Sequence, residues 1–483
     1  MNKTLSDLLK SLDIQGDKNV EITGIQLDSR KVKDGNLFVA VSGYESDGHT
    51  FIQSAIDNGA VAIIGEKNLK ERLSVPYFQV HDSREALSVL ANFFYDMPHT
   101  KHKMIGITGT NGKTTTSYML HHILKHNGKT AARLGTVEYV INGDMRESNL
   151  TTPDTVLLQE MLHESEDEYV VMEVSSHGLD QYRVHGPMFD YALFTNLSHE
   201  HLDYHKDLEN YYGTKKRLFQ CLKNEGKGIV GTYGSWGERL YEELAEEFIP
   251  SISFGQSKEV ESIFLKSFQT LPNVTVVIDD NGDEYVIKMK IQGEHNVYNA
   301  IGSYICAREI GLSPTDVVEA LETFEGVPGR FETVKLLNGS KAFIDYAHTP
   351  DGLQYALKTA KECTDRYLYH IFGFRAKRDG SKRETMVEIS QSHSDYVFLT
   401  LDDLNGTEKE DMVAELRELS KPYPNIVVID DRTEAIAHVL SLLKKGDGLI
   451  ITGKGPENYR EEYRYQTRND RETILKCMEG NAR

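Results

Sequence analysis

Short apolar runs alternate with amphipathic segments over the middle of the chain. Lys103–Thr108 reads as a buried strand, and apolar positions at helical spacing across residues 119–124 predict a helix that ends at Gly128. Tyr169–Val174 and Tyr191–Asn196 predict further strands. Strands that alternate with helices favour a largely parallel sheet flanked by helices.

The alternation resumes from residue 331 onward, and before residue 98 a strand at 36–42 and a helix at 51–58 precede a linker at Met97-Pro98. The chain is therefore predicted to hold α/β domains at 1–98, 99–330 and 331–483, the last of them Rossmann-like. The strands predicted for that last domain are Ala342–Asp345, Tyr367–Phe372, Tyr396–Thr400, Ile426–Ile429 and Leu449–Thr452.

Composition narrows the function classes. The net charge of −20 disfavours nonspecific binding to nucleic acid or to an anionic membrane surface. Because of this charge, nucleic acid is not an expected partner. No apolar run approaches the roughly 18 residues of a membrane span, and no signal peptide is recognised, so membrane insertion is not expected. Widely spaced cysteines suit a reducing compartment, and the cytoplasm is the expected location. The cysteines are Cys221, Cys306, Cys363 and Cys477.

A phosphate-binding loop is predicted between the strand at 103–108 and the helix that follows. Its residues are Gly109, Thr110, Asn111, Gly112, Lys113, Thr114 and Thr115. Glycines let backbone N–H groups approach phosphate, and the helix N-terminus adds favourable partial charge. Lys113 is expected to neutralise the β/γ-phosphates of ATP, and the Thr114 hydroxyl to join a Mg²⁺ ion. The alternative is an ordinary strand–helix turn, because Ile107 replaces the first glycine of the usual pattern.

This loop and further ordered segments resemble the Mur ligase family over nearly the whole chain. Within the family the resemblance is closest to the branch that adds the third residue of the peptidoglycan stem peptide. The matching segments are Asp28–Arg30, Gly109–Thr115, Thr151–Asp154, Glu173–Leu179, His201–Asp203, Tyr211–Lys215, Asn296–Asn299, Gly326–Arg330, Asp345–Asp351 and Gly453–Gly455.

The resemblance implies an α/β fold with three domains: an N-terminal domain for a uridine nucleotide, a central P-loop ATPase domain and a Rossmann-like C-terminal domain for an amino acid. It implies an ATP-dependent amide ligase that acts as a monomer. Its substrates would be UDP-MurNAc-L-Ala-D-Glu and an amino acid. A substrate carboxylate would attack the ATP γ-phosphate, and an amine would then displace phosphate from the acyl phosphate.

The resemblance also assigns roles around ATP. Arg330 is implied to reach the nucleotide phosphates, Asn296 to contact adenine and Asp345 to contact ribose. Carboxylate, imidazole and hydroxyl groups suit a Mg²⁺ site beside ATP, and Lys215 is implied to carry a carbamate, with Lys216 and Arg217 as alternatives. The expected metal contacts are Thr114, Glu173, His201 and carbamylated Lys215, which with Lys113 and Arg330 form the expected catalytic set.

Two groups of residues match positions that hold the substrates. The donor group is Ser29, Thr151, Thr152, Ser175, Gln181 and Arg183. The acceptor group is Arg378, Asp402, Asp403, Asn405, Gly453 and Glu457, where Arg378 is implied to hold an α-carboxylate and Glu457 an amino group.

The acceptor segments depart from the family pattern. Arg375–Asp379 replaces a glycine-rich stretch, Pro456 replaces a histidine, and Asn405 stands where diaminopimelate-adding members have an arginine. The missing arginine removes a bidentate partner for the second carboxylate of diaminopimelate, and negative charge at Asp402 and Asp403 favours an ammonium there. Together they predict lysine or ornithine over diaminopimelate. The alternatives are that this loop turns outward into solvent, or that Arg375 or Lys377 replaces the missing arginine.

The leading hypothesis is a stem-peptide ligase. A related ligase redirected to another donor or acceptor and a noncatalytic nucleotide-binding relative are the alternatives. The presence of Lys113, Glu173, His201 and Lys215 disfavours the noncatalytic alternative.

Overall fold

The computed structural model describes residues 2–15, 19–43, 46–69, 73–198, 200–255, 263–271, 274–377 and 380–481. The chain forms two compact units. The first comprises residues 1–109, 124–195 and 207–253, and the second residues 110–123, 196–206 and 254–483.

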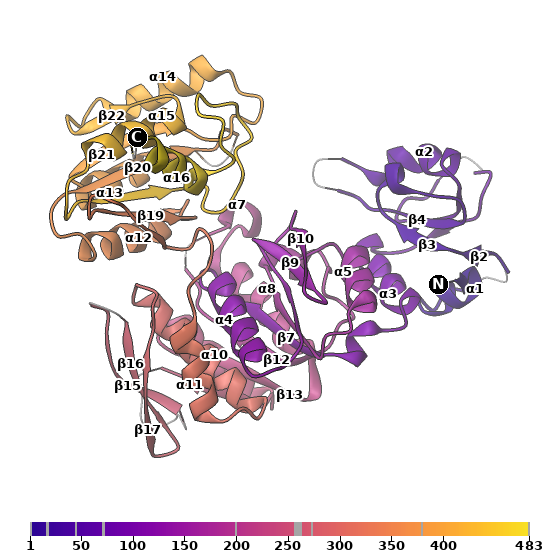
Figure 1. Ribbon diagram of the computed structural model, residues 1–483. Coiled ribbons are helices and arrows are strands. Elements are labelled where there is room, and N and C mark those ends of the chain that lie inside the picture. Colours follow the sequence, from indigo (N-terminus) through magenta and orange to yellow (C-terminus); the bar gives the residue numbers. More distant parts are fainter. Residues whose placement is uncertain are drawn as a thin grey trace. The chain divides into compact units, whose positions relative to one another are not determined.

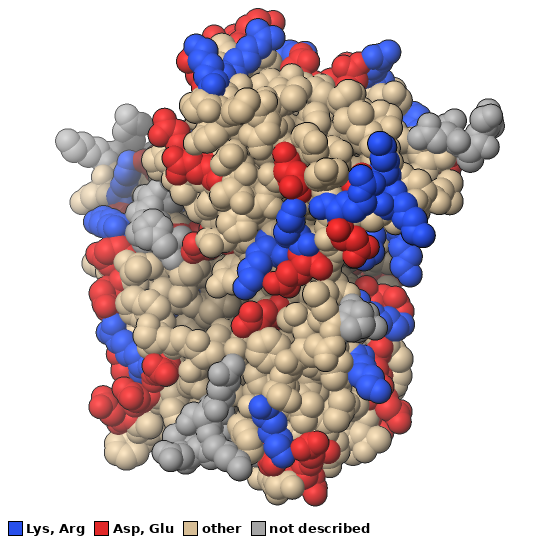
Figure 2. Space-filling model, turned by 90° about the vertical axis from the view of Figure 1, so that its left-hand side faces the viewer, with Lys and Arg blue, Asp and Glu red and all other residues tan. Residues whose placement is uncertain are grey.

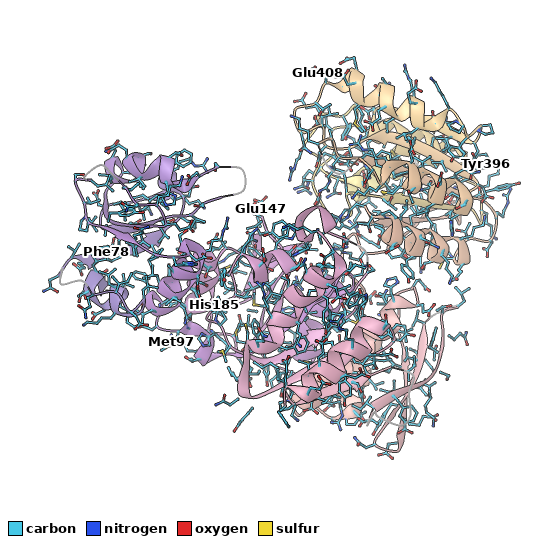
Figure 3. The ribbon with its side chains drawn as sticks, turned by 180° about the vertical axis from the view of Figure 1, so that it is seen from behind. Phe78, Met97, Glu147, His185, Tyr396 and Glu408 are labelled. Atoms are coloured by element: carbon cyan, nitrogen blue, oxygen red, sulfur yellow. The ribbon has the colours of Figure 1, made fainter. Side chains whose placement is uncertain are left out.

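The N-terminal part of the first unit is a small parallel sheet with order β3-β4-β5-β6. Helix α3 (Ser83–Phe94) begins at Asp82, whose carboxylate caps it, and packs its apolar face against strand residues such as Ile64. The expected linker follows, where Met97 has a left-handed backbone with φ 50° before the short helix η3 (Pro98–Lys101) (Figure 3). The strands are β3 (Gly24–Gln26), β4 (Asn36–Ala40), β5 (Ala60–Gly65) and β6 (Tyr77–Gln79).

The rest of the first unit is built on an eight-stranded sheet with order β10-β9-β8-β11-β7-β12-β13-β14. Strands β8, β11, β7, β12 and β13 run parallel, as the alternation of strands and helices predicts, whereas β9 and β10 form an antiparallel hairpin that the sequence did not reveal. The strands are β7 (Lys103–Thr108), β8 (Ala131–Leu134), β9 (Glu138–Ile141), β10 (Asp144–Glu147), β11 (Tyr169–Glu173), β12 (Phe189–Phe194), β13 (Leu222–Gly231) and β14 (Ser251–Phe254).

The strand order of this sheet reverses at β7. The chain leaves β7 toward β8 and β11, then returns across β7 to β12 and β13. In open α/β sheets ligands bind beyond the carboxyl ends of the strands at such a reversal. Thr108 and Phe194, the last residues of β7 and β12, pair directly, so the segments after them start at this point of the sheet.

The second unit contains a six-stranded sheet with order β18-β19-β23-β20-β21-β22, parallel except for β18 (Figure 1). One face packs against α12, α13 and α14, and the other against α15 and α16, which gives the expected Rossmann-like sandwich. The elements are β18 (Glu332–Lys335), β19 (Lys341–Asp345), α12 (Pro350–Glu362), β20 (Leu368–Phe374), α13 (Arg383–His393), β21 (Tyr396–Leu401), α14 (Lys409–Ser420), β22 (Ile426–Val428), α15 (Arg432–Leu442), β23 (Gly448–Thr452) and α16 (Asp470–Asn481).

The second unit also contains an antiparallel sheet of β15 (Ile263–Gln269), β16 (Thr275–Asp280) and β17 (Asp283–Lys288), which the sequence analysis did not predict. Helix α10 (His295–Glu309) joins this sheet through Tyr304, whose hydroxyl donates to Asp280 Oδ2 at 2.8 Å. On the face drawn in Figure 2, acidic and basic side chains are interspersed rather than segregated.

Candidate active site

The phosphate loop has the backbone that its glycines allow. Gly109 and Gly112 have φ values of 145° and 89°, and a Cβ on Gly112 would lie 2.4 Å from Asn299 Oδ1. Only glycine fits such a position. Lys113 begins α4 (Lys113–His126), and its Nζ donates to the carbonyl oxygen of Thr110 at 2.8 Å. The loop thus folds around its own lysine, as a phosphate-binding loop requires.

The segment after β12 supports this loop from the neighbouring strand end. The Thr110 amide donates to the carbonyl of Asn196 at 2.8 Å, and the Asn111 amide to its Oδ1 at 3.0 Å. Ser198 closes the contact, because its amide donates to Thr110 Oγ1 at 3.0 Å. His201, three residues further on, has a left-handed φ of 57°, and its Nε2 lies 3.9 Å from a Glu200 carboxylate oxygen.

Arg330 contacts the phosphate loop from a segment that lies 216 residues after Thr114 in the sequence. Its Nη2 donates to Thr114 Oγ1 at 3.2 Å, and its guanidinium lies 4.6 Å from the centre of the Tyr346 ring. Asp345 accepts backbone N–H bonds from Phe331 at 2.7 Å and from Ala347 at 2.8 Å. Burial raises the pKa of Asp345, and the nearby Arg330 charge opposes that rise. Arg330 and Asp345 therefore lie near one another beside Thr114.

Asn296 lies on α10, where it is tied to Asn299. Asn299 donates to Asn296 Oδ1 at 3.0 Å, and its own Oδ1 faces Gly112 and accepts from Thr116 at 3.4 Å. Asn299 lies in the matching segment Asn296–Asn299, but no site role was predicted for it. The spacing of three residues on one helix was the available signal, because such residues share a face.

Glu173 ends β11 as a buried carboxylate, and it anchors the predicted donor group in the first unit. It accepts from the Thr136 amide and hydroxyl, both at 3.0 Å, and a Cβ on Gly135 would lie 2.1 Å from it. Thr136 in turn contacts the Thr151 hydroxyl at 3.1 Å. Gly135 and Thr136, which position the Glu173 carboxylate, were not predicted from the sequence.

The rest of the donor group, apart from Ser29, continues the same hydrogen-bond network. The Thr152 hydroxyl donates to the Glu173 carbonyl at 2.9 Å and lies 3.1 Å from the Ser175 hydroxyl. Arg183 donates to the Thr152 carbonyl at 2.9 Å and to Gln181 Oε1 at 2.7 Å. Residues far apart in sequence thus form one hydrogen-bond network that begins at Glu173.

Ser29 lies in the N-terminal part of the chain, within the short helix η1 (Ser29–Lys31). The helix is capped by Asp28, and the Ser29 carbonyl accepts from Asn58 Nδ2 at 2.9 Å. Its own side chain is buried.

Lys215 is the buried member of a basic run on α8 (Leu208–Gln220). Its Nζ donates to the Gly109 carbonyl at 2.7 Å and lies 4.4 Å from the centre of the Tyr211 ring. Lys216 instead pairs with Glu243 and Glu247, at 2.8 and 2.6 Å. Of the adjacent lysines, Lys215 is the one that touches the phosphate loop.

The oxygen and imidazole groups fit the expected Mg²⁺ chemistry. Glu173 accepts from Thr136 through both oxygens, and carboxylate oxygens are ligands that Mg²⁺ prefers. Glu173 and Lys215 belong to the first unit, whereas Thr114 and His201 belong to the second.

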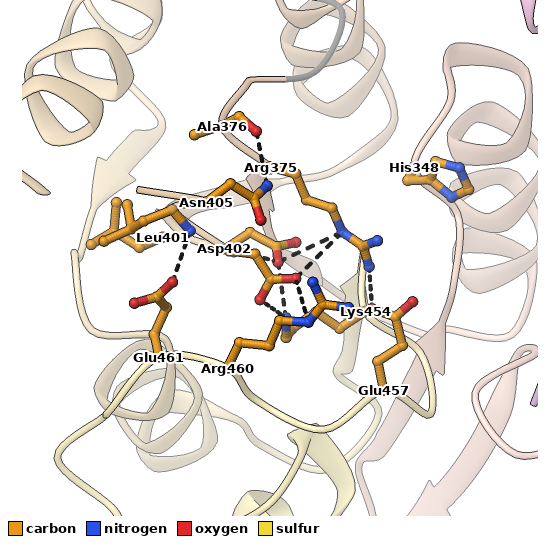
Figure 4. Close-up of polar contacts among 12 residues, drawn as sticks. His348, Arg375, Ala376, Leu401, Asp402, Asn405, Lys454, Glu457, Arg460 and Glu461 are labelled. Carbon is orange, nitrogen blue, oxygen red and sulfur yellow. Dashed lines mark hydrogen bonds and ion pairs between the residues drawn. The ribbon is translucent and has the colours of Figure 1, made fainter. Parts of the chain in front are cut away.

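A charged cluster occupies the carboxyl end of the second unit's six-stranded sheet (Figure 4). We call Arg375, Asp402, Asp403, Lys454 and Glu457 the C-terminal charged cluster. Lys454 Nζ lies 3.0 Å from Asp402 Oδ1 and 2.6 Å from Asp403 Oδ1, and all three side chains are buried. Gly453, with φ 106°, lets the chain pass Asp402, since a Cβ there would lie 3.3 Å from Oδ2.

The expectation of uncompensated negative charge at Asp402 and Asp403 is wrong. Burial raises the pKa of Asp402, but the charges of Lys454, Arg432 and Arg375 lower it further, so it falls below its ordinary value. Nor does the loop turn outward, because the Asp403 side chain is only 2% exposed. The part of the lysine or ornithine prediction that rests on this charge therefore falls, and the part that rests on the missing arginine at Asn405 stays a prediction. Arg378 lies outside the described residues.

Sequence comparisons relate the whole chain to known ligases. Profiles described as the Mur ligase family catalytic domain, the Mur ligase middle domain and the Mur ligase glutamate ligase domain match residues 21–95, 107–307 and 329–455. A Syntrophomonas wolfei protein named UDP-N-acetylmuramoyl-L-alanyl-D-glutamate--2,6-diaminopimelate ligase is 36% identical over 468 residues, covering 94% of this chain and 95% of the relative. A Clostridium acetobutylicum protein named as ligase 1 of the same kind is 38% identical over 467 residues, covering 95% of each.

The chain belongs to the Mur ligase family.

Solved structures agree with this membership. A UDP-N-acetylmuramoyl-L-alanyl-D-glutamate--2,6-diaminopimelate ligase has a TM-score of 0.69 at 26% identity, with both chains fully covered. The Thermotoga maritima MurF ligase, solved with ADP, has a TM-score of 0.65 at 23% identity, covering 95% of this chain and 97% of that one, and it supports the fold alone. In the parts of this Mur ligase that the structure describes, no helix is long and apolar enough to cross a membrane.

Proposed function

We propose that this Mur ligase uses ATP to join an amino acid to UDP-MurNAc-L-Ala-D-Glu in peptidoglycan precursor synthesis. The observation that carries the proposal is the phosphate loop, which has Lys113 folded onto it, Arg330 bonded to Thr114 and buried Lys215 bonded to Gly109. Lys113 and Arg330, both in the second unit, contact the loop as two cations, which suits a reaction in which negative charge moves between phosphate oxygens.

The chemistry proceeds through an acyl phosphate. A carboxylate oxygen of the donor attacks the γ-phosphorus, and ADP leaves with the electrons of the broken bond. The acceptor amine then attacks the acyl carbon, loses a proton, and expels inorganic phosphate. Lys113 and Arg330 neutralise charge on the transferring phosphoryl group. Thr114, Glu173, His201 and Lys215 are the residues proposed to hold Mg²⁺, which would supply further positive charge for phosphoryl transfer.

Lys215 acts as a carbamate in this proposal. Burial disfavours the ammonium form of a lysine, and only the neutral amine adds carbon dioxide. The product is an anionic oxygen ligand that suits Mg²⁺. The contact of Lys215 with the loop carbonyl at 2.7 Å, against the outward ion pairs of Lys216, supports this choice of lysine.

The domains divide the substrates among them. Residues 1–98, with Ser29, bind the uridine nucleotide, residues 99–330 bind ATP, and residues 331–483 bind the amino acid. The profile matches at 21–95, 107–307 and 329–455 support these boundaries. The proposal includes a monomer that works in the cytoplasm, and size-exclusion chromatography tests the monomer directly.

The deciding experiment combines the protein with UDP-MurNAc-L-Ala-D-Glu, ATP, Mg²⁺ and a panel of amino acids, read by mass spectrometry. The expected result is one new amide product together with phosphate release. Hydroxylamine added in place of the amino acid should trap the acyl phosphate as a hydroxamate. Absence of product and of phosphate release with every amino acid would overturn the proposal.

A second candidate is a ligase of the same chemistry that serves another donor or acceptor. The replacements at Arg375, Asn405 and Pro456 favour it, because all fall in segments that the resemblance assigns to the acceptor. Phosphate release with an amino acid but another donor carboxylate would select this candidate.

A further inference from the structure

The ring of Tyr346 lies among side chains from several loops of the second unit. Tyr346 follows β19, and a loop earlier in the sequence carries Arg330. The Arg330 guanidinium lies 4.6 Å from the centre of the ring, and the Arg375 guanidinium lies 5.8 Å from it. The tyrosine ring therefore contacts the same arginine that donates a hydrogen bond to the phosphate loop.

The loop at Gly453–Glu457 fixes the position of this ring. The Tyr346 hydroxyl donates to Glu457 Oε1 at 3.0 Å, and Arg375 contacts the other oxygen, Oε2 (Figure 4). A Cβ on Gly455 would lie 2.9 Å from the Tyr346 Cβ, so the backbone of the loop lies directly against the tyrosine. Tyr346 is thus held at both ends of its side chain, at the Cβ and at the hydroxyl.

The described residues provide the Arg330 side chain with few hydrogen bonds. Its Nη2 donates to Thr114 Oγ1 at 3.2 Å, whereas its Nε is buried and has no hydrogen-bond partner among those residues. The nearby Asp345 carboxylate is engaged by two backbone N–H donors, one on each oxygen. The Tyr346 ring supplies the further contact, since guanidinium groups are attracted to aromatic faces and stack on them.

We propose that Tyr346 is a positioning residue for phosphoryl transfer, whose ring holds the Arg330 guanidinium at the phosphate loop. This inference rests on the proposed function and concerns its first step, the formation of the acyl phosphate. Transition-state stabilisation depends on preorganised geometry, so a cation that keeps its charge but loses its position loses much of its effect. Gly455 and Glu457 support Arg330 through Tyr346.

The test measures acyl phosphate formation alone, with hydroxylamine in place of the amino acid, so that binding of the acceptor does not enter the result. Tyr346→Leu and Tyr346→Phe are compared with wild-type protein in the presence of ATP, Mg²⁺ and UDP-MurNAc-L-Ala-D-Glu. Tyr355→Leu is the matched control, because Tyr355 lies on α12 of the same unit and is 59% exposed.

Tyr346→Leu should lower kcat for hydroxamate formation about tenfold, while KM for the donor changes little. Tyr346→Phe keeps the ring and should recover most of this loss. A rate for Tyr346→Leu equal to that of the control would overturn the inference. A full loss in Tyr346→Phe would also overturn it, because the effect would then belong to the hydroxyl bond with Glu457.

A double-mutant cycle with Arg330→Ala decides whether the ring acts through the arginine. In the Arg330→Ala background, Tyr346→Leu should lower the rate by less than about twofold further, because the two substitutions remove one shared effect. Losses that multiply as independent effects would overturn the inference.

A further measurement covers the case in which Tyr346→Leu does not fold. Phenylalanine with increasing fluorine substitution at position 346 keeps the shape of the ring but weakens its attraction for a cation. The rate of hydroxamate formation should fall stepwise along this series, and a flat series would overturn the inference. Absence of both hydroxamate and phosphate release in wild-type protein would overturn the proposed function, and this inference with it.

Discussion

The phosphate loop takes its groups from one continuous stretch, Gly109–Thr115, whereas the C-terminal charged cluster gathers side chains from separate strand ends. Lys113 contacts Thr110, only three residues away, but Lys454 contacts Asp402, which is 52 residues away. The loop geometry is set by local backbone conformation at its glycines. The six-stranded sheet brings the charges of the cluster together. The ion pairs among them bury Asp402 and Asp403, so a ligand cannot reach these carboxylates.

The two regions also differ in how their charges are used. Lys113 contacts the neutral carbonyl oxygen of Thr110 within the phosphate loop. Lys454 instead forms ion pairs with the buried carboxylates of Asp402 and Asp403. We therefore expect Lys113 to serve the chemistry of the phosphate loop and Lys454 to stabilise the C-terminal charged cluster, and substitutions should separate these roles.

The largest effect is expected for Lys113→Ala. Its loss removes a preorganised cation from the transferring phosphate, which should lower ATP-dependent phosphate release by about 1000-fold, in line with removal of a strong transition-state contact. Circular dichroism and the unfolding midpoint should stay near those of wild type. Lys125→Ala, an exposed lysine on the same helix, serves as the control. Near-normal turnover in a folded Lys113→Ala protein would refute the role.

Lys454→Met should act on stability first. Two buried aspartates would lose their cation, and breaking a buried pair in this way costs about 3–5 kcal/mol of unfolding free energy. Urea unfolding measures the loss, with exposed Lys445→Met as the control. Adding Asp402→Asn and Asp403→Asn to Lys454→Met should recover part of it. A stability change within about 0.5 kcal/mol of wild type would contradict the structural assignment.

Lys215→Ala is expected to lower turnover roughly 100-fold, because the loop loses the proposed carbamate and its contact with Gly109. Small carboxylic acids should partly restore activity by supplying the missing oxygens. Lys216→Ala, which removes the ion pairs to Glu243 and Glu247, should keep most activity. Labelled bicarbonate followed by NMR should reveal the carbamate in wild type. A fully active Lys215→Ala protein with no labelled carbamate in wild type would refute it.

The smallest effect is the pH response of Asp402. Its pKa in the folded state lies below the ordinary value, so its contribution to stability is present above the unfolded pKa and is lost as the pH falls through the folded pKa. The loss belongs to the range below about pH 4. Asp402→Asn should show a shallower fall of the unfolding midpoint over that range than wild type does. Parallel curves would mean that Asp402 does not carry this dependence.

Much of the fold followed from periodicity. Lys103–Thr108 forms β7 with the predicted bounds, and every strand predicted in the last domain is present, although β20 extends to Phe374 and β22 stops at Val428. The hairpin of β9 and β10 and the sheet of β15, β16 and β17 were missed, because short antiparallel strands lack a long apolar run.

The donor group shows the limit of sequence reasoning on the first unit. Thr151 and Thr152 were expected in the donor group and Glu173 at the metal site, and hydrogen bonds connect them in the structure. Thr136, which links Glu173 to Thr151, was not expected, because a single threonine between two strands has no pattern of its own. Only the packing of β11 beside β8 brings it to the carboxylate.

What the sequence determined by itself is the alternation of strands and helices in the parallel sheets and the residues of the phosphate loop. These depend on apolar periodicity and on glycine conformation, which act over a few neighbouring residues. Only the tertiary structure decided the charge state of the acceptor region. In the sequence, Asp402 and Asp403 suggest free negative charge. In the structure, Lys454 follows β23 and forms ion pairs with both aspartates. Asn405 binds the backbone of Ala376, next to Arg375, whose guanidinium lies near Asp402. Coulomb interactions depend on distance in space, and sequence separation does not reveal that distance.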